Sequence, residues 1–506
     1  MFKGHPKGLY ALALANTGER FGYYTMLAVF ALFLRANFGL DAGVAGAIYS
    51  TFLGLVYLMP LVGGIMADKF GFGKMVTIGI TIMFAGYLLL SLPLGGDLVA
   101  MLAMLAALLF ISLGTGLFKG NLQVMVGDLY NDPQYAAKRD SGFSLFYMAI
   151  NIGALFAPTA AVKIKEWAEV SLGYSGNDAY HFSFAVACVS LILSIAIYYI
   201  FRPTFRHVEG GKSKKGDAPA AAVEQLTPAE TKQRVVALCL VFAVVIFFWM
   251  AFHQNGLTLT YFADEFTAKS SEGLQSMLFN VWNLVLVIIG VYAAFSVFQS
   301  ESKKGKFTSL AVLVAVVGVL VYKALNVEGT ISISAPIFQQ FNPFYVVALT
   351  PVSLAIFGAL AKRGKEPSAP RKIAYGMLVA AVGFAVMAVG SVGLLTPDAQ
   401  AAAGDAAVFA SPNWLISTYL VLTFAELLLS PMGISFVSKV APPKYKGLMM
   451  GGWFVATAIG NWLVSVGGFL WGGISLTVVW SVFIVLCLLS ALFMFVMMKR
   501  LEAATK

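Results

Sequence analysis

Residues 16–24 read Asn-Thr-Gly-Glu-Arg-Phe-Gly-Tyr-Tyr, which puts two adjacent charges, Glu19 and Arg20, inside an apolar segment from about Leu9 to Leu34. A charge at the centre of a bilayer costs roughly 2.5–3.5 kcal/mol on insertion scales, so it normally faces a helix bundle or a wet cavity. At about 100° per residue, the polar and aromatic side chains here share one helix face, namely Asn16, Glu19, Arg20, Tyr23 and Tyr24. The pattern predicts a helix that lines a solute cavity. The alternative is a structural Glu19–Arg20 pair that tethers neighbouring helices.

The composition predicts an all-α polytopic membrane protein. The chain has 506 residues, of which 59% are hydrophobic and 11% are charged, and its mean hydropathy is +0.82. A soluble domain has about 25% charged residues. The net charge of +10 does not indicate nucleic-acid binding, because the basic residues fall in short loops. Cys188, Cys239 and Cys487 lie in apolar segments without zinc spacing, so we expect no metal site, disulfide framework or cofactor.

Fourteen apolar segments are long enough to span a bilayer, which takes about 20 residues. Their approximate limits are 9–34, 44–67, 75–93, 98–122, 142–162, 181–201, 235–263, 274–299, 307–325, 337–361, 372–395, 413–437, 447–471 and 474–498. The Gly- and Lys-containing residues after the sixth segment are typical of a flexible linker. We expect an N-terminal six-helix bundle at 1–202, a cytoplasmic linker at 203–234, and a C-terminal bundle at 235–506 with two inserted helices at about 274–325.

The basic residues predict the orientation in the membrane. If the N-terminus is inside, most of the 34 Lys and Arg residues fall in inside loops, and this alternation holds through all fourteen segments. Cytoplasmic loops carry such an excess of Lys and Arg. The pattern therefore predicts that both termini are cytoplasmic in an integral, multi-pass membrane protein. The short loops favour a bacterial inner (plasma) membrane.

The connection between the second and third segments reads Gly63-Gly-Ile-Met-Ala-Asp-Lys-Phe-Gly71. It resembles the cytoplasmic signature loop of the major facilitator superfamily. Glycines allow helices to approach closely, and an Asp–Lys pair can hold a cytoplasmic gate. We therefore predict a gating loop that contains Gly63, Gly64, Asp68 and Lys69. The alternative is an ordinary tight turn with positive-inside charges.

The fourth and fifth segments add two polar positions at membrane depth. Lys119, in Gly114-Thr-Gly-Leu-Phe-Lys-Gly-Asn121, needs a carboxylate partner, for which Glu19 is the candidate. Tyr147 and Asn151 are spaced i, i+4 and face the same way. Asn151 either contacts a ligand or bridges two helices.

Several motifs, in the same order over most of the chain, resemble those of the proton-coupled oligopeptide transporters (the POT or PTR family) of the major facilitator superfamily. Residues 16–24 resemble the family's E-x-x-E-R-F-x-Y-Y motif, and Phe146 to Leu155 resembles its F-Y-x-x-I-N-x-G-S-L signature. Further resemblances lie at Gly114–Tyr130, Gly63–Lys69, Phe338–Pro343, Phe424–Gly433 and Met449–Phe454. The resemblance implies a major facilitator fold of two six-helix bundles, here with two extra helices.

The resemblance also implies a peptide site between the bundles. Asn151, Asn342 and Glu426 would hold the amino end of the peptide, and Arg20 and Lys119 would hold its carboxylate. The residues implied to shape the side-chain pockets are Tyr23, Tyr24, Tyr57, Tyr147 and Trp453. A zwitterionic peptide needs opposite charges at the two ends of one cavity, and these residues supply them.

Three positions depart from the family pattern. Asn16 replaces the first Glu of the motif, Leu27 stands where a second Arg is usual, and His253 stands where the seventh core helix usually has an acidic residue. The second Arg and the acidic residue of the seventh helix are lost together, so neither is left as an unpaired buried charge. Their loss removes a salt bridge that would close the outer gate. The candidates for proton coupling are then Glu19, beside Lys119, and His253. Histidine is a candidate because imidazole titrates near pH 6.5. Alternatively, His253 is a neutral hydrogen-bonded residue.

We therefore expect a monomeric secondary active transporter that imports di- and tripeptides by proton symport and alternating access. One alternative is a related carrier of nitrate, drugs or another small solute. Another is a peptide carrier with altered or lost proton coupling. An enzyme is not indicated, because the connectors contain no catalytic triad, metal cluster or phosphate-binding loop.

Overall fold

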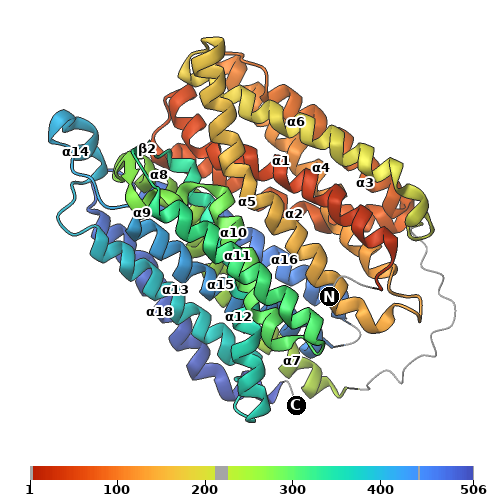
Figure 1. The fold of residues 1–506 in the computed structure, drawn as a ribbon. Coiled ribbons are helices and arrows are strands. Elements are labelled where there is room, and N and C mark those ends of the chain that lie inside the picture. The colour runs from red at the N-terminus through yellow and green to blue at the C-terminus, as the bar shows by residue number, and fades with distance from the viewer. Residues whose placement is uncertain (1–3, 211–225, 443–444, 505–506) are drawn as a thin grey trace.

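The computed structural model describes residues 4–210, 226–442 and 445–504, and it is built almost entirely of helices (Figure 1). Within these residues, fourteen helical segments are long and apolar enough to cross a membrane. This confirms the number of spans predicted from the sequence. Of the predicted linker, residues 211–225 lie outside the described residues.

The first six helices pack against one another and form what we call the first bundle. Their bounds are α1 (Lys7–Phe38), α2 (Ala42–Phe70), α3 (Phe72–Leu90), α4 (Leu98–Asp128), α5 (Arg139–Leu172) and α6 (Gly176–Ile200). Helix α1 packs on α5 and α6, α2 on α4, and α3 on α4. Side-chain caps begin several of them: Asp41 accepts from the Val44 N–H in α2, and Asp97 from the Ala100 N–H in α4. Such caps satisfy N–H groups that lack a partner within the helix.

The second bundle is formed by the helices that follow the linker. Its long helices are α7 (Pro228–Phe252), α12 (Phe341–Lys362), α13 (Ala369–Gly390), α15 (Asn413–Val440), α16 (Lys446–Trp462) and α18 (Leu476–Ala503). Its shorter helices are α8 (Thr258–Glu265), α14 (Pro397–Ala402) and α17 (Ser465–Phe469). Helix α13 packs on α15 and α18, and α7 packs on α16. The two bundles lie side by side in Figure 1.

The predicted span 235–263 is not one continuous helix. Helix α7 ends at Phe252, a 3₁₀ turn covers His253–Gly256, and α8 begins at Thr258. The Asn-Gly pair within the turn is a strong turn former. The break frees the Asn255 carbonyl, which accepts from the hydroxyls of Tyr419 at 2.9 Å and Thr260 at 3.1 Å. Backbone groups freed at membrane depth need such partners. The hydropathy of the sequence gives no signal for a break of this kind.

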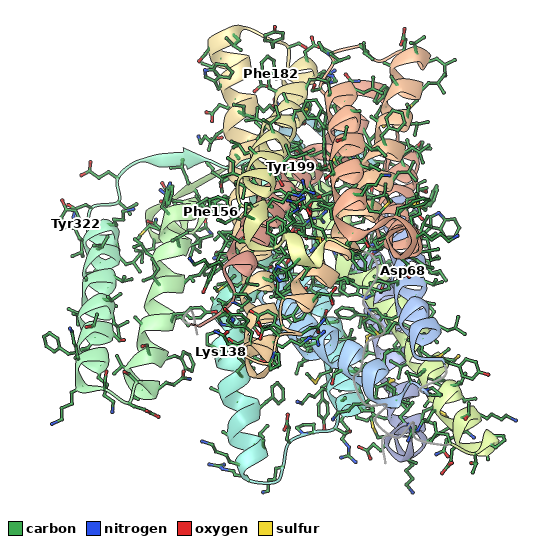
Figure 2. The ribbon with its side chains drawn as sticks, turned by 90° about the vertical axis from the view of Figure 1, so that its right-hand side faces the viewer. Asp68, Lys138, Phe156, Phe182, Tyr199 and Tyr322 are labelled. Atoms are coloured by element: carbon green, nitrogen blue, oxygen red, sulfur yellow. The ribbon has the colours of Figure 1, made fainter. Side chains whose placement is uncertain are left out.

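The two extra helices form a hairpin at the side of the molecule. Helices α10 (Val281–Gln299) and α11 (Lys303–Leu325) pack on each other, and α10 packs on α12. A short antiparallel pair, β1 (Ser270–Glu272) with β2 (Thr330–Ser332), ties the ends of the hairpin together. Figure 2 shows the hairpin standing apart from the bundles, with Tyr322 on its outer helix. The first helix begins at Val281 rather than near 274, after the short helix α9 (Gly273–Ser276) and a 3₁₀ turn (Met277–Phe279).

The predicted gating loop is helical in the structure. Helix α2 continues to Phe70 and α3 begins at Phe72, so Gly71 alone connects them, with φ 94°. The positive φ suits glycine and allows so short a connection. The four residues assigned to the loop, Gly63, Gly64, Asp68 and Lys69, therefore belong to the last turns of α2. Asp68 and Lys69 are exposed, and Figure 2 shows Asp68 at the right-hand edge of the molecule.

The two ends of the molecule differ in how the bundles meet. We call the end near the two chain termini the terminal face, and the opposite end, near β2 and α14, the distal face (Figure 1). Near the distal face, Arg35 of α1 forms an ion pair with Glu265 of α8. The Tyr261 hydroxyl donates to the Ala42 carbonyl at 3.4 Å, and the Trp471 indole donates to Glu265 at 2.9 Å. The first two contacts join the bundles at the distal face, and Trp471 holds Glu265 within the second bundle.

Candidate functional site

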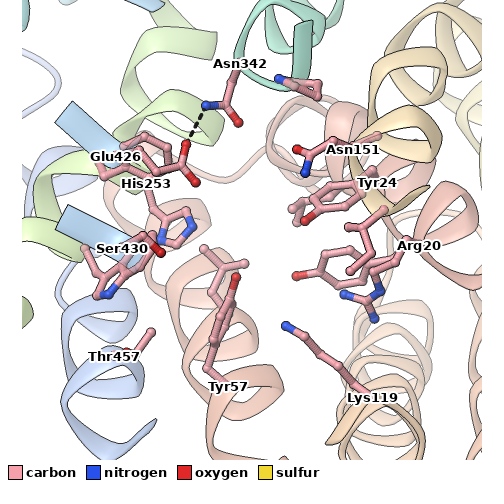
Figure 3. Close-up of a pocket in the computed structure, with 18 of the residues that line it drawn as sticks. Arg20, Tyr24, Tyr57, Lys119, Asn151, His253, Asn342, Glu426, Ser430 and Thr457 are labelled. Carbon is pink, nitrogen blue, oxygen red and sulfur yellow. Dashed lines mark hydrogen bonds between the residues drawn. The ribbon is translucent and has the colours of Figure 1, made fainter. Parts of the chain in front are cut away.

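A cavity of about 320 Å³ lies between the two bundles. Side chains from both bundles line it and face one another across it (Figure 3). The predicted residues that line it are Arg20, Tyr23, Tyr24, Tyr57, Lys119, Tyr147, Asn151, His253, Asn342, Glu426 and Trp453. Glu19 and the four residues of the predicted gate, Gly63, Gly64, Asp68 and Lys69, are not among the lining residues.

Glu19 and Arg20 form a closed pair on α1. The Arg20 Nε and Nη2 atoms each donate to a different Glu19 oxygen at 2.5 Å. The two side chains are 0% and 2% exposed respectively. The Arg20 guanidinium also lies 4.6 Å from the centroid of the Tyr23 ring. The charge of Arg20 is thus balanced by its chain neighbour, and the predicted pairing of Glu19 with Lys119 is wrong, because Glu19 directs both oxygens to Arg20.

Lys119 of α4 reaches the cavity from the first bundle. Its ammonium lies 4.5 Å from the centroid of the Tyr57 ring, which is a cation–π contact. Within the described part of the chain, no carboxylate forms an ion pair with Lys119. Unlike the charge of Arg20, which Glu19 balances, the charge of Lys119 is therefore available to a ligand in the cavity.

Glu426 of α15 lies on the opposite wall, in the second bundle. The Asn342 Nδ2 atom donates to a Glu426 oxygen at 3.0 Å and to the Thr423 hydroxyl at 3.0 Å. Asn151, on the first bundle, donates its Nδ2 to the Tyr147 carbonyl at 3.0 Å. Figure 3 shows the side-chain oxygens of Asn342 and Asn151 pointing toward each other at the top of the cavity. Both amides use their N–H groups within the protein, so their oxygens are left to accept from a ligand.

His253 begins the 3₁₀ turn after α7 and faces the first bundle. Its Nδ1 atom hydrogen-bonds the Asn461 side-chain oxygen, and its ring stacks on Trp249 with centroids 5.1 Å apart. Across the cavity its ring centroid lies 6.0 Å from that of Tyr57. If Nδ1 carries the proton of a neutral imidazole, the other nitrogen is an acceptor. The hydrogen-bonded alternative for His253 thus has its partner in Asn461 of α16.

Several cavity residues were not predicted from the sequence. Gln123, Ser430 and Thr457 line the cavity. Each lies four residues after a predicted residue, namely Lys119, Glu426 and Trp453. Residues spaced i, i+4 share a helix face, so extending each predicted position by one turn would have found them.

The cavity reaches toward the terminal face. Tyr147 lines it and yet is 48% exposed. It lies about two turns from Arg139, where α5 begins. On the distal side the cavity is covered by inter-bundle hydrogen bonds, from Gln339 to the Ala28 carbonyl at 3.1 Å and from Thr159 to Gln340 at 3.0 Å. These contacts close the cavity on its distal side.

Over the described ranges, no three His, Cys, Asp or Glu side chains come together as metal ligands. The cavity offers one free ammonium, one carboxylate, amide oxygens and aromatic rings. This set of groups can bind a molecule that carries a cationic and an anionic end.

Comparisons with known proteins agree with this geometry. A model of the POT family (PTR2) matches residues 73–224 and 323–468. The peptide transporter YePEPT of Yersinia enterocolitica is 32% identical over 482 residues, which cover 91% of this chain and 87% of the relative. The uncharacterized transporter YclF of Bacillus subtilis is 29% identical over 483 residues, with 90% and 86% covered. A crystal structure of a peptide transporter POT with sulfate has a TM-score of 0.75 at 24% identity, covering 100% of this chain and 96% of that one, which shows the same fold.

Proposed function

The chain belongs to the POT family, and from that premise we propose that it is a secondary active transporter of di- and tripeptides in a bacterial inner membrane. The single observation that carries the proposal is the placement of Lys119 and Glu426 on opposite walls of one cavity. A zwitterionic peptide has an ammonium and a carboxylate at its two ends. A relative of similar length is named as a peptide transporter.

The amino end of the peptide binds at the top of the cavity in Figure 3. An ammonium has three N–H donors. The Glu426 carboxylate and the oxygens of Asn342 and Asn151 supply three acceptors for them. Charge-assisted hydrogen bonds of this kind are stronger than neutral ones.

The carboxyl end binds toward Lys119 and Arg20, which line the wall of the first bundle. The aromatic walls accept varied side chains, because rings offer large contact areas without demanding particular hydrogen bonds. The residues proposed for these walls are Tyr23, Tyr24, Tyr57, Tyr147 and Trp453.

Transport proceeds by alternating access, in which the two bundles rock around the central site. The positive-inside distribution of Lys and Arg supports a cytoplasmic position for the terminal face. The conformation described here is then the inward-facing one. Movement of the α2 end that carries Gly63, Gly64, Asp68 and Lys69 contributes to closing the cytoplasmic side.

Protons drive uptake by binding at Glu19 or at His253. Protonation of Glu19 would release Arg20 from its partner, and protonation of His253 would add a charge near Tyr57 and Lys119. Each event changes the charge balance between the walls and so favours one orientation of the bundles. A peptide carrier without proton coupling is the second candidate, and the presence of Leu27 and His253 in place of a charged pair favours it.

The test is uptake of dialanine into proteoliposomes with and without an inward-directed proton gradient. Accumulation above the external concentration only with the gradient is the expected result. Equilibration or exchange without accumulation would keep the peptide site and remove proton drive. No uptake and no competition by peptides would contradict peptide transport itself.

The variants His253→Ala and Glu19→Gln locate the coupling residue. We expect the variant that lacks the proton carrier to exchange peptides but to lose gradient-driven accumulation. If both variants still concentrate dialanine, neither residue carries the proton.

A further inference from the structure

The connection between α10 and α11 carries an excess of positive charge at the edge of the molecule. Lys303, Lys304 and Lys306 lie in the first turn of α11 and are exposed. Glu301 precedes them, so three positive charges and one negative charge leave a net charge of +2. The β1–β2 pair ties the other ends of the hairpin together near the distal face, so this connection lies toward the terminal face (Figure 1). We propose that this end of the hairpin binds the headgroup of an anionic phospholipid whose acyl chains lie along α11.

The first step of the argument is that the three lysines have no carboxylate partner. Within the residues that the structure describes, none of them forms an ion pair. Basic residues at the start of α13, toward the same face, do form ion pairs: Arg371 with Glu502 at 2.7 Å, and Lys372 with Glu366 at 2.5 Å. The charge of the hairpin lysines is therefore free to attract an anion from outside the chain.

The second step is that the lysines adjoin an apolar surface. All of α11 lies in the described part of the chain, and Val316 is its one buried residue. Phe298 and Phe307, on the two sides of the connection, are 85% and 75% exposed. Lysine stems can lie along such a surface while their ammonium groups reach the headgroups. A dissolved phosphate ion would leave the aromatic rings without a contact, so the surface fits a phospholipid better than a free anion.

The third step is that the connection is folded tightly and holds the lysines together. The Ser302 hydroxyl accepts from the Gly305 N–H at 3.0 Å, and the Ser300 hydroxyl donates to the Ser302 carbonyl at 3.4 Å. A Cβ at Gly305 would overlap the Ser300 hydroxyl, so the connection lies directly against the start of the helix. The three ammonium groups therefore start from about one helix turn. Clusters of Lys next to a membrane-spanning helix attract anionic headgroups.

The experiment is native mass spectrometry of the full chain released from detergent micelles that contain phosphatidylglycerol or phosphatidylcholine with the same acyl chains. We expect phosphatidylglycerol to bind at least about 10-fold more tightly, because its headgroup is anionic. Equal binding of the two lipids would overturn the inference. The competitor sn-glycerol 3-phosphate has the phosphate without acyl chains and should not displace the lipid. Its displacement of phosphatidylglycerol at equal concentration would assign the surface to a dissolved anion and would also overturn the inference.

A matched pair of triple variants tests the position of the site. The test variant replaces all three hairpin lysines with glutamine. The control removes the same number of exposed positive charges from three other helices, by Lys7→Gln, Lys232→Gln and Lys499→Gln. We expect the preference for phosphatidylglycerol to fall to about 2-fold in the test variant and to persist in the control. Equal losses in the two variants would show that only net charge matters, and would contradict a site on the hairpin.

The same spectra give the number of chains in each particle. A dimer that the test variant dissociates would assign the surface to a second copy of this chain and would overturn the inference. If the triple variant does not fold, the single substitutions Lys303→Gln, Lys304→Gln and Lys306→Gln replace it, and each should lower the lipid preference by a smaller step. No peptide enters the experiment, so its outcome is independent of the proposed function.

Discussion

Glu19 and Arg20 balance each other's charge within one turn of α1, so neither residue needs a partner from another helix. This arrangement keeps two charges at membrane depth without tying α1 to a neighbour. It also sets the electrostatics of the cavity, since the ligand meets one cation and one anion. The stability of the first bundle should accordingly depend on the pair as a unit.

Replacing Glu19 with Gln should destabilise the protein by about 3–5 kcal/mol, because a buried Arg20 would lose its counter-charge. Thermal unfolding in detergent measures the loss. The double variant Glu19→Gln with Arg20→Gln should recover much of it, since no unpaired charge then remains. A double variant as unstable as the sum of the two single variants would show that the residues do not act as a pair.

Glu426→Gln should weaken dialanine binding by about 10- to 100-fold, because a hydrogen bond to a charged group is worth about 1.5–3 kcal/mol. The matched control is Glu166→Gln, which alters an exposed carboxylate paired with Lys163 and should have no effect. Titration of both purified variants with dialanine makes the comparison. Unchanged affinity in Glu426→Gln would remove this residue from the amine site.

At the scale of single residues, the sequence located the cavity lining well, because charged and polar groups in apolar segments have few stable positions. From the sequence, Glu19, Arg20 and Lys119 could be placed at a similar depth in the membrane. It could not decide which side chain Glu19 contacts, since that depends on rotamers and on the distance between α1 and α4.

At the scale of elements, close helix contacts in the first bundle depend on particular glycines. A Cβ at Gly63 would overlap the backbone carbonyl of Gly116 on α4, whereas a Cβ at Gly64 would meet nothing within 4 Å. The Asn121 amide also donates to the Gly63 carbonyl at 3.1 Å. Gly63 is thus a packing position between α2 and α4.

This contrast gives a prediction within one helix. Gly63→Ala should cost about 1–3 kcal/mol, because the added methyl group overpacks a tight contact. Gly64→Ala should be neutral or slightly stabilising, since alanine favours helix more than glycine does. Thermal unfolding of the two variants measures the difference, and equal stabilities would contradict the described contact between α2 and α4.

The positions of the spans were predictable because apolar length and loop charge are properties of local sequence. Whether each span forms one continuous helix was not predictable from these properties. The break at His253–Gly256 depends on hydrogen bonds from Tyr419 to Asn255, which lie far apart in the sequence. The helical end of α2 was missed for a related reason, because one glycine at position 71 suffices to turn the chain.

For the whole molecule, the distal face is closed by polar contacts at its rim. Arg35 and Glu265 join the bundles there, and Trp471 and Tyr261 hold the pair from the side of the second bundle. The distal face is thus closed although Leu27 and His253 do not form a charged pair.

Glu265→Gln should make the distal closure easier to open. The Arg35 and Glu265 side chains are 31% and 19% exposed, so the effect should be modest, about 2- to 5-fold in the open population. Leu53 of α2 lines the cavity. The measurement is labelling of a cysteine placed at Leu53 by a membrane-impermeant thiol reagent applied from the distal side. The parallel control, Glu166→Gln, should label at the parent rate, and an unchanged rate in Glu265→Gln would show that the pair does not restrain opening.

Of the two hairpin helices, α10 makes the main contacts with the rest of the protein, and the central window of α11 is only 6% buried. Lipid is therefore the main solvent of the outer helix. At 1.5 Å per residue, its 23 residues span about 34 Å, against about 28 Å for the 19 residues of α10. A helix that is longer than the bilayer is thick can be accommodated by tilting. We therefore expect the tilt of the hairpin to differ between membranes of different thickness.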